Sequence, residues 1–82
     1  MGGIVMQELL IALAQGLVED PAAVTVTVDD VNEEGVVVYH LHVAEGDMGR
    51  VIGKQGRIAK AIRTVMRAAA SRKDQKVAVE ID

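Results

Sequence analysis

The residues best suited to chemistry lie in one stretch, 48–63, with the sequence MGRVIGKQGRIAKAIR. It holds three of the eight glycines and five of the nine basic residues of the chain. Glycine is costly in ordered structure unless the backbone must turn sharply or approach another group closely. Glycines combined with cationic side chains are typical of sites where a peptide backbone meets a phosphate. The stretch therefore predicts a turn that binds a phosphate-bearing ligand.

Two kinds of phosphate loop can be excluded from the spacing. A nucleoside-triphosphate loop needs four residues between its glycines and a Ser or Thr after its lysine. The segment from Gly49 to Gln55 is one residue short and lacks the hydroxyl. A dinucleotide-binding loop needs a preceding strand and three spaced glycines, but only Gly53 and Gly56 fit. Neither nucleotide class is predicted.

Charge is segregated along the chain although the net charge is only −3. Residues 1–49 contain nine acidic and no basic residues, and residues 50–82 contain nine basic and three acidic residues. Between Arg50 and Lys73 there are eight basic residues and no acidic one. Such segregation indicates two faces with different partners.

Hydrophobic periodicity predicts six main elements. They are a helix over 4–18, strands over 24–28 and 36–43 joined by a polar turn, a short helix over 47–52 with Asp47 as its N-cap, a longer helix over 57–71 and a strand over 76–82. The order α-β-β-α-α-β predicts an α+β fold, a three-stranded sheet packed on one face by helices. The first two strands are expected to be antiparallel.

The longer helix has two chemically distinct sides. At 100° per residue, four apolar residues cluster on the side expected to be buried: Ile58, Ile62, Val65 and Ala69. Four basic residues form a stripe on the opposite side: Arg57, Lys60, Arg63 and Arg67. The stripe begins beside the glycine turn.

The motif Val51-Ile52-Gly53-Lys54-Gln55-Gly56, placed between two helices in this order of elements, resembles the K-homology (KH) domain in its type II arrangement. The resemblance implies that the GXXG loop clamps about four backbone nucleotides of single-stranded RNA or DNA. The amino end of the following helix would contribute its unpaired N–H groups and positive dipole end to the same place.

The longer segment GDMGRVIGKQGRIAKAIR, residues 46–63, resembles the KhpA family of small single-domain bacterial RNA-binding proteins. The likeness covers Met6 to Asp82, and residues 1–5 are assigned as an extension or cloning remnant. It implies a cytoplasmic protein that binds single-stranded RNA as a chaperone or post-transcriptional regulator, without a cofactor. It also implies pairing with itself or with the KH-containing protein KhpB, and effects on cell shape and cell wall growth.

The expected RNA-binding residues fall into three groups. The backbone clamp is Gly53, Lys54, Gln55 and Gly56. The electrostatic residues are Arg50, Arg57, Lys60 and Arg63. The residues that shape the groove are Val51, Ile52 and Ile58, with a strand such as 36–43 as its floor.

The alternative is an interaction module whose main role is to dimerise. The acidic half of one copy would meet the basic half of another, and Val36 and Val38 on the outer sheet face would be covered. In that case the loop is structural. Changing Lys54 and Gln55 to Asp would then leave function intact.

Other functions lack the residues they need. Ser71 has no histidine placed to act as its base, so no catalytic residue is assigned. His40 and His42 lack a third ligand nearby, so no metal site is assigned. The chain contains no Cys, and no apolar run approaches the ~18 residues of a spanning helix. No membrane partner is expected.

Overall fold

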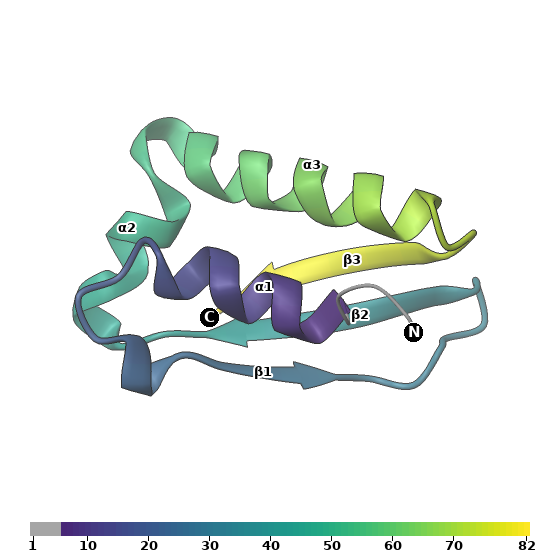
Figure 1. The fold of residues 1–82 in the computed structure, drawn as a ribbon, viewed down its shortest axis with the longest axis horizontal. Coiled ribbons are helices and arrows are strands. Elements are labelled where there is room, and N and C mark those ends of the chain that lie inside the picture. Colours follow the sequence, from purple (N-terminus) through teal and green to yellow (C-terminus); the bar gives the residue numbers. More distant parts are fainter. Residues whose placement is uncertain (1–5) are drawn as a thin grey trace.

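Residues 6–82 are described by a computed structural model, in which three helices pack with a three-stranded sheet (Figure 1). The helices and strands are α1 (Met6–Gln15), β1 (Thr25–Val28), β2 (Val36–His42), α2 (Met48–Ile52), α3 (Arg57–Ser71) and β3 (Lys76–Ile81). The predicted extension, residues 1–5, lies outside the described residues, as does the start of the helix predicted over 4–18.

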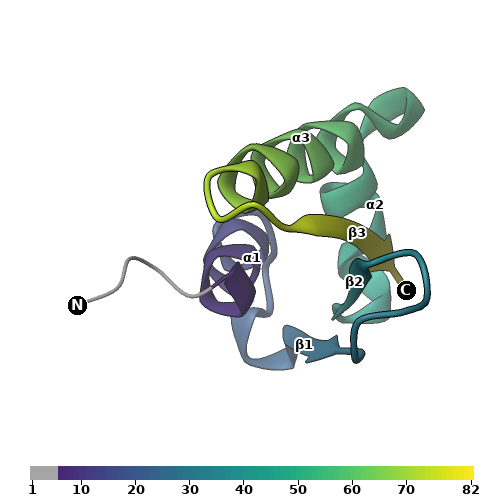
Figure 2. The same ribbon diagram turned by 90° about the vertical axis from the view of Figure 1, so that its right-hand side faces the viewer.

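The predicted α+β fold and its type II order are confirmed. The strands lie in the order β1-β2-β3. β1 pairs antiparallel with β2, with Thr25 opposite His42, and β3 pairs parallel with β2, with Val36 opposite Lys76. Figures 1 and 2 show α1 and α3 on the same face of the sheet, while α2 lies beyond the end where β2 finishes. This arrangement leaves β3 as an edge strand.

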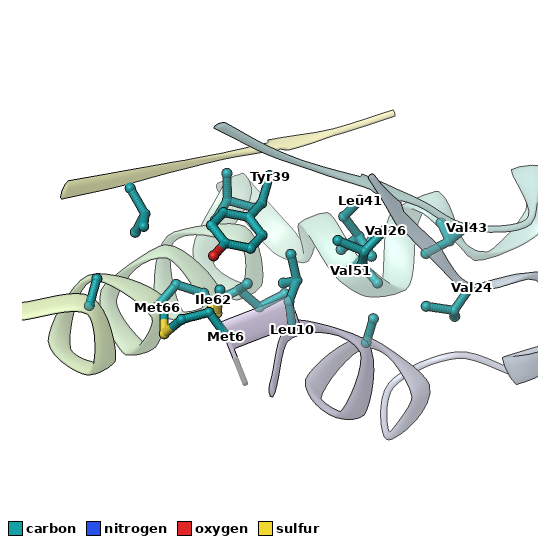
Figure 3. Packing of buried hydrophobic residues seen from close by; sticks show 14 residues of the cluster. Met6, Leu10, Val24, Val26, Tyr39, Leu41, Val43, Val51, Ile62 and Met66 are labelled. Atoms are coloured by element: carbon teal, nitrogen blue, oxygen red, sulfur yellow. The ribbon is translucent and has the colours of Figure 1, made fainter. Parts of the chain in front are cut away.

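The core fills the space between the sheet and the helices (Figure 3). Leu10 of α1, Leu41 of β2, and Met66 of α3 are fully buried there. Successive strand residues point to opposite faces, and Tyr39 of β2 and Val79 of β3 are buried on the face that meets the helices. Burial of this apolar surface holds α3 against the sheet.

Two predicted helix ends differ from the structure. α1 ends at Gln15 rather than at residue 18, and the chain tightens after it, since the N–H of Leu17 donates to the Ala14 carbonyl three residues back instead of four. A single-turn 3₁₀ helix, Glu45–Asp47, precedes α2. Asp47 occupies the predicted N-cap position of α2, but its side chain makes no capping hydrogen bond to that helix end.

The buried face of α3 is rotated from the predicted one. Its buried residues are Ala59, Ile62, Met66 and Ala70, which lie roughly 75° around the helix from the predicted set. Val65, predicted as buried, is 42% exposed because it faces the gap between α1 and α3. The rotation brings Arg63, at the margin of the basic stripe, against β3.

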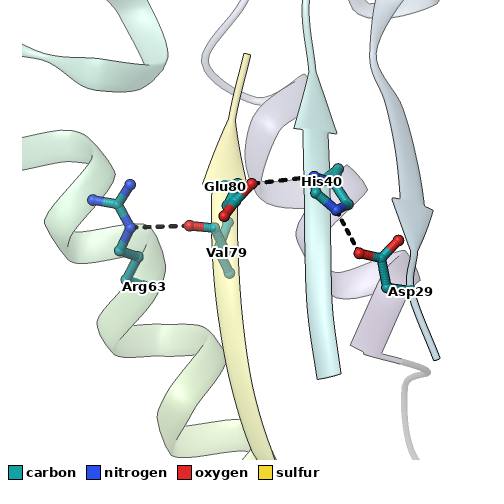
Figure 4. A network of polar contacts seen from close by, with 5 residues as sticks. All are labelled: Asp29, His40, Arg63, Val79 and Glu80. Carbon is teal, nitrogen blue, oxygen red and sulfur yellow. Dashed lines mark hydrogen bonds and ion pairs between the residues drawn. The ribbon is translucent and has the colours of Figure 1, made fainter. Parts of the chain in front are cut away.

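The outer face of the sheet carries an ionic chain that joins the residue directly after β1 to β2 and β3 (Figure 4). His40 Nε2 lies 2.9 Å from Asp29 Oδ2, and His40 Nδ1 lies 3.4 Å from Glu80 Oε1. The hydrogen bond to Asp29 raises the pKa of His40 above its ordinary value of about 6.5, and the charges of Asp29, Glu80 and Asp82 act in the same direction. The protonated ring therefore links β2 to both of its neighbours.

We expect this chain to make stability depend on pH. A folded-state pKa above the unfolded value means that the contribution of His40 is fully present below about pH 6.5 and is lost as pH rises through the folded value. Urea denaturation from about pH 5 to about pH 9 should show this loss for the native sequence and not for His40→Gln. His42→Gln is the control, since His42 forms no ion pair within residues 6–82. Identical pH slopes for His40→Gln and the native protein would contradict the assignment.

Candidate nucleic-acid interface

The glycine motif forms a tight turn between α2 and α3. The N–H of Gly53 donates to the Gly49 carbonyl at 2.8 Å and so closes α2. One 3₁₀ turn, Lys54–Gly56, then leads into the first residue of α3. Gly53, Gln55 and Gly56 have φ values of 77°, 59° and 75°. Three residues with positive φ among these four lead the chain sharply from α2 into α3.

The two glycines are required for different reasons. At Gly53 an added Cβ would lie 2.3 Å from Ile58 Cγ1 and 2.9 Å from the Ile58 nitrogen. The backbone there also has ψ 175°, a combination with positive φ that is essentially restricted to glycine. At Gly56 an added Cβ would meet nothing within 4 Å, so only its left-handed φ favours glycine. Gly53 is where the loop backbone packs directly on α3.

We predict that Gly53→Ala destabilises the protein more than Gly56→Ala. Backbone strain and the displaced Ile58 should lower the free energy of unfolding by about 2–4 kcal/mol for Gly53→Ala. Gly56→Ala should cost about 1 kcal/mol, the left-handed penalty alone. Urea denaturation of both variants tests this. Gly56→Asn is the matched control, because Asn tolerates the left-handed region and should be nearly neutral. Equal losses for the two alanine variants would refute the distinction.

Three basic side chains surround the turn without acidic partners. Lys54, Arg57 and Lys60 are exposed, and within residues 6–82 none of them forms an ion pair. Arg57 donates a 3.4 Å hydrogen bond to Gln55 Oε1. Their charges and the positive end of the α3 dipole face the same region. The region is built to attract an anion.

Arg50 differs from these three. Its Nη2 lies 3.1 Å from Glu19 Oε1, and its Nε lies 3.4 Å from Asp47 Oδ1. Two carboxylates therefore offset the charge of Arg50, which is one of the residues predicted to attract RNA electrostatically. The half-exposed guanidinium connects α2 to the segment after α1.

Asp47 is the buried anchor of this connection. It is 3% exposed, and its two carboxylate oxygens accept the backbone N–H groups of Glu19 and Asp20, each at 3.1 Å. Hydrogen bonds to a charged acceptor are stronger than neutral ones. Asp47 thus fixes the segment between α1 and β1 against the start of α2. No local pattern in the sequence reveals this role, because the partners lie 27 and 28 residues away.

We expect Asp47→Ala to lower the free energy of unfolding by about 2–3 kcal/mol, since it leaves two partly buried N–H groups without an acceptor. Faster hydrogen exchange at the amides of Glu19 and Asp20 should accompany the loss. Glu45→Ala, which removes an exposed carboxylate two residues away, is the control and should change stability by less than about 0.5 kcal/mol. Unchanged exchange at both amides would contradict the anchor.

The strand beside α3 is β3, not the predicted 36–43. β2 is the central strand, whereas Arg63 Nε of α3 donates to the Val79 carbonyl of β3 at 3.2 Å (Figure 4). The N–H of Asp82 bonds to Leu41 of β2, and successive residues of a strand face opposite sides. The backbone groups of Val79 and Ile81 therefore face the free edge, where α3 lies.

The three predicted groove residues occupy different depths. Val51 is fully buried in the core, where it packs α2 against the rest of the fold. It therefore presents no surface to a ligand, although it was predicted to shape the groove. Ile52 is 38% exposed, and Ile58 is partly buried against Gly53. Ile52 and Ile58 are the two that can touch a ligand beside the turn.

A sequence profile described as KhpA/KhpB, KH domain, matches residues 7–81. The chain belongs to this family. A KhpA described as an RNA-binding protein from Clostridium acetobutylicum is 51% identical over 76 residues, covering 93% of this chain and 99% of the relative. The RNA-binding protein KhpA of Listeria monocytogenes is 46% identical over 76 residues, covering 93% and 97%.

Two solved structures share the fold. A variant of Aquifex aeolicus Era bound to GDP.AlF4- matches with a TM-score of 0.66, and Era in complex with MgGDPNP and nucleotides 1506–1542 of 16S ribosomal RNA matches with a TM-score of 0.68. Both are 21% identical; each match covers 93% of this chain but only 29% and 28% of the Era chains. At this identity the likeness concerns the KH fold alone.

The part of the chain from residue 6 onward contains no group of three or more His, Asp or Glu side chains that could hold a metal ion. No described helix is long and apolar enough to cross a bilayer.

Proposed function

We propose that α2, α3 and the free edge of β3 together form a groove in which this KhpA/KhpB-family protein binds single-stranded RNA, with the GKQG turn clamping the RNA backbone. The observation that carries the proposal is the turn itself, which places two glycines, Lys54 and the amino end of α3 at one point. Curated KhpA relatives named as RNA-binding proteins over nearly their whole length support it.

Each part of the groove suits one part of an RNA strand. The turn has no side chain at Gly53 and Gly56, so a sugar-phosphate backbone can approach it closely. Lys54, Arg57 and Lys60 supply mobile cations for phosphates. Ile52 and Ile58 offer apolar surface to base faces. Tyr39 is the chain's single aromatic residue and is buried, so stacking on aromatic side chains contributes nothing and weak affinity follows.

The biological roles proposed here are those of a cytoplasmic RNA chaperone or post-transcriptional regulator that works as a pair of KH chains. A family that unites KhpA and KhpB supports pairing with itself or with KhpB. An apolar groove of about 210 Å³ between α1 and α3 supports a protein contact there; its lining residues are Leu13, Leu17, Ile58, Ala61, Ile62 and Val65. Two joined weak clamps would gain effective concentration.

The test is binding of a short unstructured RNA over a salt series. Neutralising about three or four phosphates should make log K fall with log salt at a slope of roughly −2 to −3. Lys54→Asp/Gln55→Asp places two carboxylates in the turn and should abolish measurable binding. Fluorescence anisotropy of a labelled oligonucleotide measures both quantities.

A matched control exists at the other end of α3. Gln75→Asp/Lys76→Asp makes the same change of residue types and of charge, about 20 Å along α3 from the turn. It should bind RNA nearly as the native protein does. Equal losses in the two double variants would mean that only net charge matters. Full RNA binding by the folded turn variant would favour a dimerisation module with a structural loop.

A further inference from the structure

Arg63 occupies a different environment from the other basic residues of α3. It is half-buried, whereas Arg57, Lys60 and Arg67 are exposed. Its Nε donates to the Val79 carbonyl on the free edge of β3 at 3.2 Å. A guanidinium is planar, so this bond fixes the orientation of the whole group.

The outer fork of Arg63 is left open by that bond. Figure 4 shows both Nη nitrogens on the side of the guanidinium away from Val79. Within residues 6–82 they have no hydrogen-bond acceptor and no ion-pair partner. Glu80, the next residue along β3, directs its carboxylate to His40 on the outer sheet face instead. Four N–H donors are therefore held in place without being satisfied by protein.

The position of Arg63 does not suit a phosphate bound at the turn. Arg63 follows Gly56 by seven residues, which places it about 10 Å along the axis of α3 from the turn. It contacts the Val79 carbonyl on the free edge of β3, a backbone hydrogen-bonding group of the kind that meets base edges. Phosphate contacts are expected from the exposed cations nearer the turn.

We propose that Arg63 is a specificity-determining residue that reads a base edge carrying two adjacent acceptors. This inference rests on the proposed RNA binding. Guanine offers O6 and N7 to an arginine fork, and cytosine offers O2 and N3 in the same geometry. Uracil and adenine present a donor beside each such acceptor, so one N–H of the fork would face another N–H. The groove thus selects guanine or cytosine over adenine and uracil at one position.

The bond to Val79 is what distinguishes this contact from simple charge attraction. A lysine at position 63 would keep the positive charge but could not donate through a fixed fork. The Val79 carbonyl holds the fork in plane before RNA arrives, so little side-chain entropy is lost on binding. Arg67 lies one turn further along the same stripe without such a bond within the described chain. It is the matched control.

The experiment uses the full chain and a set of short oligouridines that differ at one central base. The native protein should bind the guanine- or cytosine-containing RNA about fivefold or more tightly than the adenine and all-uracil forms. Arg63→Lys should remove that preference while changing the affinity for oligouridine by less than about twofold. Arg67→Lys should leave both the preference and the affinity as they are. Circular dichroism confirms that both variants are folded.

Modified bases identify which edge is read. If guanine is preferred, 7-deazaguanine, which lacks the N7 acceptor, should bind no better than adenine. If cytosine is preferred, zebularine, which keeps O2 and N3 but lacks the amino group, should bind as cytosine does.

The outcomes separate the two proposals. RNA binding without a base preference, or a preference that survives in Arg63→Lys, overturns the role of Arg63 alone. An equal loss for every RNA in Arg63→Lys assigns the residue to structure or phosphate binding and also overturns it. No binding of any RNA by the native protein at low salt overturns the proposed function together with this inference.

Discussion

The packing of Gly53 against Ile58 is the constraint on which the candidate site depends. With no Cβ at position 53, the end of α2 can lie directly on the first turn of α3. Any side chain there would push the helices apart, because the nearest atoms include the backbone nitrogen of Ile58. Close-packed interiors transmit such a displacement rather than absorb it. The close approach of the end of α2 to the first turn of α3 therefore depends on the absence of a Cβ at position 53.

Several acidic residues of the first half of the chain have structural roles in the fold. Asp47 fixes the segment after α1, and together with Glu19 it offsets the charge of Arg50. Asp29, together with Glu80 from the basic half, holds His40 on the outer sheet face. These acids act inside the fold or on the face away from the groove. The unpaired cations Lys54, Arg57 and Lys60 therefore gather near the turn, which is why charge segregated in sequence becomes segregated in space.

Much of the fold could be predicted from the sequence because its signals are local. Runs rich in valine indicate the strands, and a glycine turn between two helical patterns indicates the order of elements. The span of α3, residues 57–71, was predicted correctly, but its buried face was not. Ala59 and Ala70 have small side chains, so a helical wheel favours the larger and more hydrophobic Val65 as a buried residue. Only the packing of α3 on both the sheet and α1 decides between the two faces, and that information is tertiary.

The site divides in the same way between what is local and what is not. The clamp residues follow one another in the chain, so a motif can reveal them. The roles of Asp47 and Arg63 depend on partners 27 and 16 residues away in sequence, so no motif could. In particular, Arg63 looks like its neighbours Lys60 and Arg67 in the sequence, and only the Val79 carbonyl sets it apart. A groove built this way can keep a general RNA clamp constant while one arginine, held by a strand edge, determines which base it favours.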